Sequence, residues 1–211
     1  MSAKLNLCKE FHEWARSLPR HTSPYNKSAI PKNGIYFLFE KGEKAHKGAR
    51  VVRVGTHTGV GQLPSRLLQH FINENKDRSI FRKNIGRALL NKARDPYLKL
   101  WEIDLTPAAV RKLHGGRINF AKQKGIERAV TTFMRKHFEF AVLQVDDQKK
   151  RLELESKIIS TLSSCESCTP STKWLGAYSP KEKIRDSGLW QVNELYKTPL
   201  SKKDLAFLKG V

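Results

Sequence analysis

The sequence has few acidic residues for the number of basic ones. Its 211 residues include 40 Lys and Arg but only 20 Asp and Glu, which gives a formal net charge of +20 and a pI near 10.1. The positive charges of such a chain repel one another, and binding to a polyanion relieves this repulsion. We therefore expect the partner to be a nucleic acid. The basic residues are spread along the whole chain, which favours binding through a folded body over binding through a basic tail.

Long apolar runs and paired cysteines are also missing. No stretch approaches the ~20 apolar residues of a membrane span, and the N-terminus lacks the apolar core of a secretion signal. Three cysteines, an odd number, argue against a secreted disulfide framework. We therefore expect a cytoplasmic protein with no membrane partner. Hydrophobic residues make up 39% of the chain, with ten Phe and four Trp, which supports a buried core and argues against disorder.

Two short apolar runs predict an antiparallel hairpin. The first alternates between two faces, one with Ile35, Phe37 and Phe39 and the other with Tyr36 and Leu38. The second, residues 51–55, is β-branched and ends at Gly55. The polar residues between the two runs predict a longish loop.

A helix is predicted directly after this hairpin. A glycine-rich turn at 56–61 leads to Pro64, which fits the first turn of a helix because its missing N–H costs nothing there. Arg66 and His70 are four residues apart, so their side chains leave the same face of that helix. A tyrosine in a hairpin followed by this pair has catalytic potential.

These segments carry a resemblance to the GIY-YIG nuclease family. In order along the chain, the matching segments are Gly34-Ile35-Tyr36, Arg53-Val54-Gly55, Arg66, His70 and Glu155-Ser156-Lys157-Ile158-Ile159. The resemblance covers about residues 31–162 and implies an α/β (α+β) fold, with a small, mainly antiparallel central sheet flanked by helices. Residues 1–30 would add an N-terminal helix and connection, and 163–211 an extension packed on the core.

The same resemblance implies a metal-dependent DNA endonuclease. Tyr36 would activate or position the attacking water, Arg66 would hold the scissile phosphate, and His70 would assist proton transfer. Glu155 would hold one divalent cation, Mg²⁺ or another such as Mn²⁺. Arg53 stands where the family usually has an aromatic residue, and we include it among the catalytic candidates.

The residues around Glu155 leave two roles open for it. Residues 151–162 predict a helix on which Leu152, Glu155, Ile159 and Leu162 share a face. A carboxylate on an apolar face either meets a cation or lines a cleft. A salt-bridged structural role is the alternative, and the Ile-Ile pair at the family spacing favours the catalytic one.

Further basic residues are candidates for binding double-stranded DNA. Ser79 can cap a helix over residues 80–93, and Arg82, Lys83 and Arg87 lie off its apolar stripe. They form either a solvated basic face or a surface that follows the phosphates, and the overall charge favours the second. His57 is expected either to contact a phosphate or to be an exposed loop residue.

Several other segments complete the expectations. We expect strands at 97–105 and 138–145 and helices at 5–18 and 125–136, from their periodicity. Cys165 and Cys168 form a lone C-x-x-C with no second pair, which predicts a surface loop with two free thiols.

Two functions remain as alternatives to a DNA endonuclease. One is a non-catalytic basic protein that binds nucleic acid on the same scaffold, and the other is an RNA-directed nuclease. The survival of Tyr36, Arg66 and Glu155 together favours an enzyme.

Overall fold

The fold is built on one antiparallel sheet with helices on both faces. The computed structural model describes residues 3–210, so the ends of the predicted terminal segments, residues 1–2 and 211, lie outside it. The four strands follow the order β1-β4-β2-β3 and every pairing is antiparallel. Their bounds are His21–Thr22 (β1), Gly34–Ala45 (β2), Gly48–Gly55 (β3) and Phe138–Gln144 (β4). The predicted α+β fold is confirmed.

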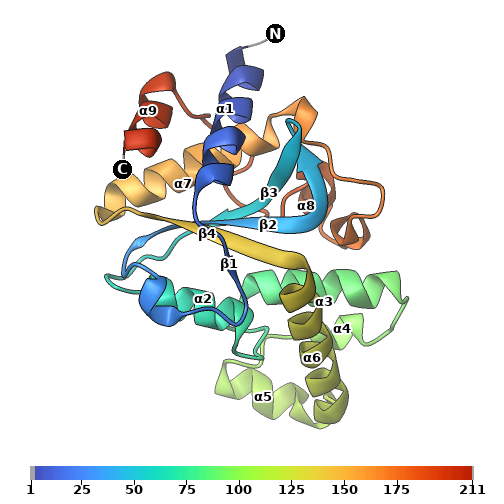
Figure 1. Ribbon diagram of the computed structural model, residues 1–211. Helices are drawn as coiled ribbons and strands as arrows, with labels where there is room; N and C mark the ends of the chain where they lie inside the picture. The colour runs from blue at the N-terminus through green and yellow to red at the C-terminus, as the bar shows by residue number, and fades with distance from the viewer. Residues whose placement is uncertain (1–2, 211) are drawn as a thin grey trace.

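Helices cover the two faces of the sheet (Figure 1). One face carries α1 (Ala3–Ser17), α7 (Gln148–Ser163) and α9 (Lys202–Gly210). The other carries α2 (Leu63–Phe71), α3 (Ile80–Lys92), α4 (Leu98–Trp101), α5 (Ala108–His114) and α6 (Phe120–His137), while α8 (Glu182–Ser187) lies beside the hairpin. The helices predicted at 5–18, 80–93, 125–136 and 151–162 are therefore present, as is the strand at 138–145.

In the part of the chain that the structure describes, none of the helices combines the length and apolar character that crossing a bilayer requires.

The central hairpin is buried on both faces. Ile35, Phe37 and Phe39 join the core under α1 and α7, while Tyr36 and Leu38 join the core over α2 and α3. The predicted longish loop is wrong. The strands continue until only His46 and Lys47 connect them, both at positive φ (50° and 64°), as a two-residue type I′ turn requires.

The strand expected at 97–105 is also wrong, because residues 98–101 form the short helix α4. The alternating pattern concealed a helical one, in which Tyr97 and Trp101 lie one turn apart and both face inward. Trp101 is fully buried and donates its indole N–H to the Lys83 carbonyl at 3.0 Å. A Cβ on Gly86 would lie 2.3 Å from this ring, so glycine there lets α3 and α4 pack closely.

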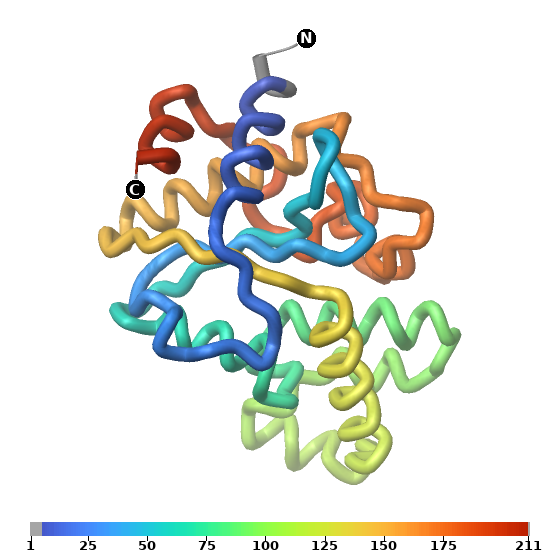
Figure 2. Tube along the Cα trace, viewed as in Figure 1, coloured from blue at the N-terminus to red at the C-terminus, as the bar shows by residue number. Residues whose placement is uncertain are grey.

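The chain after α7 wraps around the hairpin before it ends at α9. Trp174 and Trp190 both donate to the buried carboxylate of Glu40, at 2.8 Å each. The backbone N–H of Trp190 also donates to the Val52 carbonyl at 2.8 Å, along the outer edge of β3, which this segment covers. Figure 2 shows this segment returning to place α9 next to α1. The wrapping brings residues 190–194 close to β3 and α7.

Candidate active site

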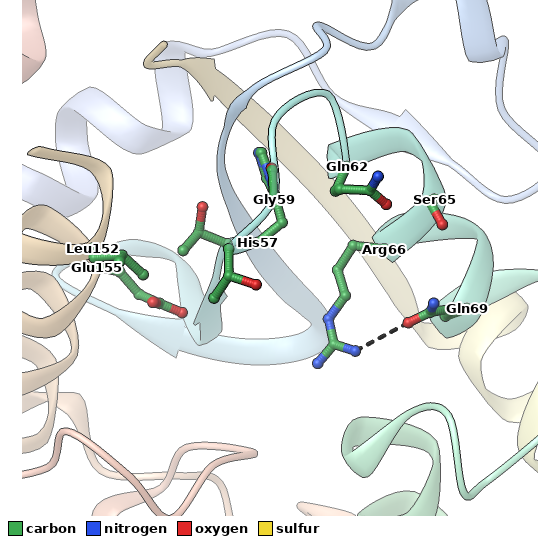
Figure 3. Close-up of a pocket in the computed structure, with 10 residues that line it drawn as sticks. His57, Gly59, Gln62, Ser65, Arg66, Gln69, Leu152 and Glu155 are labelled. Atoms are coloured by element: carbon green, nitrogen blue, oxygen red, sulfur yellow. Dashed lines mark hydrogen bonds between the residues drawn. The ribbon is translucent and has the colours of Figure 1, made fainter. Parts of the chain in front are cut away.

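Two adjoining hollows lie between α2, α3, α7 and the segment after α8. Their cavity volumes are about 570 Å³ and 480 Å³, and Arg66, Leu152 and Glu155 line both. Figure 3 shows Arg66 entering from α2 and Glu155 standing across the first hollow on α7. Two residues that the sequence separates by most of the chain therefore share one pocket.

Tyr36 and His70 form a hydrogen-bonded pair behind this pocket. The Tyr36 hydroxyl lies 2.8 Å from His70 Nε2, and His70 Nδ1 lies 2.7 Å from Ser79 Oγ. Ser79 also caps α3, accepting the Arg82 N–H at 3.2 Å. Tyr36 and His70 are both completely shielded from solvent. The sequence predicted the cap but not its second role as the partner of His70.

Gly55 allows Tyr36 to reach this position. The two residues are paired across β2 and β3, and the Tyr36 ring lies over the glycine. A Cβ at position 55 would be 2.1 Å from the Tyr36 hydroxyl oxygen. The last residue of the second triplet therefore has to be glycine for the Tyr36–His70 bond to form.

The surroundings of His70 keep its ring neutral. Burial lowers the pKa of His70 well below its usual range, and the nearby guanidiniums of Arg66, Arg53 and Arg82 lower this pKa further. A neutral imidazole has one N–H donor and one acceptor nitrogen. If Nδ1 donates to Ser79, Nε2 is left to accept the Tyr36 hydroxyl proton.

Arg66 extends into the pocket without a carboxylate partner. Among the described residues it forms no ion pair within 4 Å, and its contacts are with Gln69 Oε1 at 3.1 Å and the Arg78 carbonyl at 3.4 Å. Much of its donor fork is therefore free to meet an anion.

Arg53 lines the second hollow but is not a surface residue. Only 6% of it is exposed, and one guanidinium nitrogen donates to the Trp190 carbonyl at 2.5 Å. The guanidinium carbon lies 5.2 Å from the centre of the Phe81 ring. Its Nε is buried without a hydrogen-bond partner among the described residues. Arg53 is thus held at the pocket wall with donor capacity to spare.

Glu155 stands at the junction of the two hollows, half-buried. Burial raises its pKa from 4.5 to about 7, against the effects of Arg53, a hydrogen bond from the Thr56 backbone and Arg66. In the described part of the chain no Lys or Arg nitrogen pairs with it within 4 Å. The structural ion pair considered as an alternative is therefore not observed, and Glu155 lines a cleft.

The exposed basic face expected on α3 is a wrong prediction. Arg82 is fully buried and forms an ion pair with Glu127 at 2.7 Å, while Lys83 is 8% and Arg87 6% exposed. Lys83 donates to the Glu102 carbonyl at 2.8 Å, and Arg87 binds the Glu102 carboxylate through two nitrogens at 2.6 Å and 2.5 Å. Burying so many cations requires internal acceptors, and these contacts supply them. The three side chains hold α3 to α4 and α6.

His57 lines the first hollow, but both ring nitrogens are engaged within the protein. Nε2 accepts the Gly34 N–H at 3.2 Å, and Nδ1 lies 2.6 Å from the Gly59 carbonyl. Burial lowers the pKa of His57, so the ring is neutral. The expectation of an exposed loop histidine is wrong, since only 6% of the residue is exposed. Its ring fixes the start of the hairpin to the glycine turn.

The pocket also contains polar residues that the sequence did not single out. Asn193 and Gln191, from the segment after α8, and Asn84, from α3, line the second hollow with Arg53 and Glu155. Asn193 lies far from Glu155 along the chain, where spacing gives no signal.

The chain matches a known domain family over nearly its whole length. The match is to the GIY-YIG domain and extends over residues 7–210. Neither the curated proteins nor the solved structures include a significant match to the chain.

Proposed function

Because this chain belongs to the GIY-YIG family, a family of nucleases, we propose that it is a metal-dependent endonuclease that hydrolyses phosphodiester bonds in double-stranded DNA. The observation that carries the proposal is the convergence of Arg53, Arg66 and Glu155 on one pocket, with the Tyr36–His70 pair directly behind it.

The two arginines would bind the scissile phosphate. Arg66 has no carboxylate partner among the described residues, and Arg53 has a buried Nε without an acceptor. A guanidinium offers two parallel N–H groups to two phosphate oxygens, and such charge-assisted bonds are roughly twice as strong as neutral ones. Arg53 would thereby take over phosphate binding at the position where the family has an aromatic residue.

Glu155 would hold a divalent cation, with Asn193 as a neighbouring oxygen donor. The residues fit such an ion, because a half-buried carboxylate with a raised pKa lacks a cation partner and oxygen is the donor that Mg²⁺ and Mn²⁺ prefer. When bound, the ion stabilises negative charge on the phosphoryl oxygens and on the leaving 3′-oxygen. A single carboxylate leaves most of its coordination to water and the phosphate.

Tyr36 and His70 would position the attacking water. His70 Nε2 accepts the hydrogen bond of the Tyr36 hydroxyl and so fixes its direction, which leaves the lone pairs of the tyrosine oxygen to accept a hydrogen bond from the water. Both residues are shielded from solvent here, so access requires a movement at the pocket wall. We place this movement at Arg53 and Arg66, which a bound phosphate would draw towards itself.

Cleavage of defined substrates tests the proposal. The purified protein is incubated with supercoiled, linear, branched and single-stranded DNA and with RNA, with and without added Mg²⁺ or Mn²⁺. We expect nicking of double-stranded DNA only with added metal. Stronger cleavage of RNA would replace DNA as the substrate, and binding without cleavage of any substrate would support the non-catalytic alternative.

Variants test the residue roles in the same assay. Tyr36→Phe and Arg66→Ala should each lower the cleavage rate by about 10²-fold or more while leaving the protein folded. Arg78→Ala is the matched control, because this exposed arginine contacts Arg66 only through its backbone. Equal losses in the control and in Arg66→Ala would indicate a general charge effect and contradict a specific role for Arg66.

A further inference from the structure

All three cysteines of the chain gather at one place far from the candidate active site. Cys8 lies on α1, and Cys165 and Cys168 flank the short turn Glu166–Cys168 that follows α7. His46, in the turn between β2 and β3, points its Nε2 at the last two. The thiols of Cys165 and Cys168 are free, as predicted, but the predicted surface location is wrong, because Cys168 is 6% exposed and Cys165 is half-buried.

We propose that Cys8, His46, Cys165 and Cys168 bind one structural zinc ion. Their ligand atoms all lie within 4.8 Å of one another. Three thiolates and one imidazole form one of the donor sets that tetrahedral structural zinc sites use.

Three of the six separations within the cluster are close to those of a tetrahedron around one ion. Zn–S bonds of about 2.3 Å and a Zn–N bond of about 2.0 Å place two sulfurs about 3.8 Å apart and a sulfur and a nitrogen about 3.5 Å apart. Here Cys8 Sγ and Cys168 Sγ are 3.4 Å apart. His46 Nε2 is 3.5 Å from Cys165 Sγ and 3.4 Å from Cys168 Sγ.

Other uses of the three cysteines fit less well. A disulfide requires a sulfur–sulfur distance of about 2.0 Å, it engages two thiols only, and it gives the histidine no role. An iron–sulfur cluster spreads its ligands over several iron atoms, whereas these four atoms all lie within 4.8 Å of one another. The thiolate-rich set with one imidazole is typical of zinc.

Contacts within the protein hold the ligands in place. Arg16 donates to the carbonyls of Ala45 and His46 at 3.2 Å each, which fixes the turn against α1. His46 adopts φ = 50°, which is unusual for a residue other than glycine, and this places its ring beside the cysteines. His12 is not a ligand, because Nδ1 is 3.0 Å from the Cys8 carbonyl and Nε2 accepts the Val51 N–H at 3.2 Å.

The ion would join three segments that are distant in the sequence. Cys8 and Cys168 are 160 residues apart, and the hairpin turn lies between them. The turn that ends at Cys168 begins the segment that carries Gln191 and Asn193 to the pocket. Zinc would therefore anchor the start of the chain that completes the candidate active site, without itself taking part in cleavage.

Metal analysis of the full-length protein tests the proposal directly. The protein is purified without chelators and its metal content measured by mass spectrometry. We expect one zinc ion per chain and three thiols that react only after denaturation with a chelator. Protein that is free of zinc, and that takes up none after reduction and dialysis against Zn²⁺, would overturn the proposal. So would a disulfide between Cys165 and Cys168 in freshly isolated protein.

Variants and cobalt substitution locate the ion. Cys165→Ser and His46→Gln should lose zinc, while His114→Gln, on α5, and Glu155→Gln, in the active site, should keep one ion per chain. If the ligand variants fail to fold, the parent protein loaded with Co²⁺ still decides the matter. A tetrahedral thiolate site gives intense visible absorption bands, and the weak bands of octahedral cobalt would contradict it. Zinc retained in full by a folded Cys165→Ser protein would also overturn the assignment.

Discussion

Glu155→Gln should stabilise the protein at alkaline pH while it stops cleavage. In the folded protein the pKa of Glu155 is raised from 4.5 to about 7, mainly by burial. The folded state therefore resists ionisation of this side chain more than the unfolded state does. Glutamine has the same shape and can accept the same hydrogen bond, but it carries no charge to desolvate.

The size of this effect follows from the pKa difference. Well below pH 4.5 the carboxyl group is neutral in the folded and the unfolded state, and it does not change the free energy of unfolding. As pH rises through 4.5 the unfolded state ionises first, so stability falls until the folded group ionises near pH 7. At pH 8 the cost reaches about 3 kcal/mol, and at pH 5 it is below about 1 kcal/mol. For a chain of this length, 3 kcal/mol is roughly 6–12 °C in Tm.

Thermal unfolding at pH 5 and pH 8, without added Mg²⁺, measures the difference. Glu153→Gln is the matched control on the same helix, because Glu153 is exposed and its pKa is lowered by its bond to Lys157 at 2.6 Å. The control should lose a little stability at pH 8, with the opposite sign to Glu155→Gln. A lower Tm for Glu155→Gln at pH 8 would mean that the carboxylate stabilises the fold through an ion pair, and would refute the reasoning.

Three further predictions concern the buried parts of the site. Gly55→Ala should lower the free energy of unfolding by about 1–3 kcal/mol and abolish most of the cleavage, because the new Cβ displaces Tyr36. In the same unfolding and cleavage assays, the control Gly125→Ala should leave stability and cleavage intact, because a Cβ there meets nothing within 4 Å. Glu127→Ala should destabilise the protein by roughly 3–5 kcal/mol, since it leaves the buried guanidinium of Arg82 and the backbone N–H of Lys76 without their acceptor, and a Tm equal to the parent's would contradict this role. Because Glu155 must lose its proton to bind metal, apparent Mg²⁺ affinity should rise about tenfold from pH 6 to pH 8 in metal titrations of cleavage, and a flat profile would exclude Glu155 as the ligand.

The sequence predicted the part of the site that depends on local pattern. Alternation placed Tyr36 on one face of the hairpin, and the spacing of four residues placed Arg66 and His70 on one side of α2. Tyr36 and His70 come together through β2, β3 and α2, which follow one another along the chain. The match in order along the chain then identified the family, which the comparison with known domains confirms.

The errors concern residues whose partners are distant in the sequence. Arg82 and Arg87 look like a solvated face on α3, and only the fold shows that α6 and α4 cover them with Glu127 and Glu102. The chain has few acidic residues, and several of them form ion pairs with buried cations. Composition alone does not reveal these pairs.

The cysteine cluster illustrates the same limit. Cys165 and Cys168 have no second pair at metal-binding spacing, so local spacing predicts no metal site. Cys8 and His46 complete the ligand set through the fold. Three cysteines and one histidine suffice for a structural zinc site, but nothing in their spacing along the chain indicates that they meet.

The central claim is that the pocket around Glu155 is a metal-dependent nuclease site. The most direct measurement is nicking of supercoiled plasmid by the parent and by Glu155→Gln, prepared in parallel and matched for zinc content and DNA binding. The account predicts that the parent nicks the plasmid only with added divalent cation, while Glu155→Gln binds the plasmid at least as well and leaves it supercoiled. Nicking by Glu155→Gln at the parent's rate would contradict it.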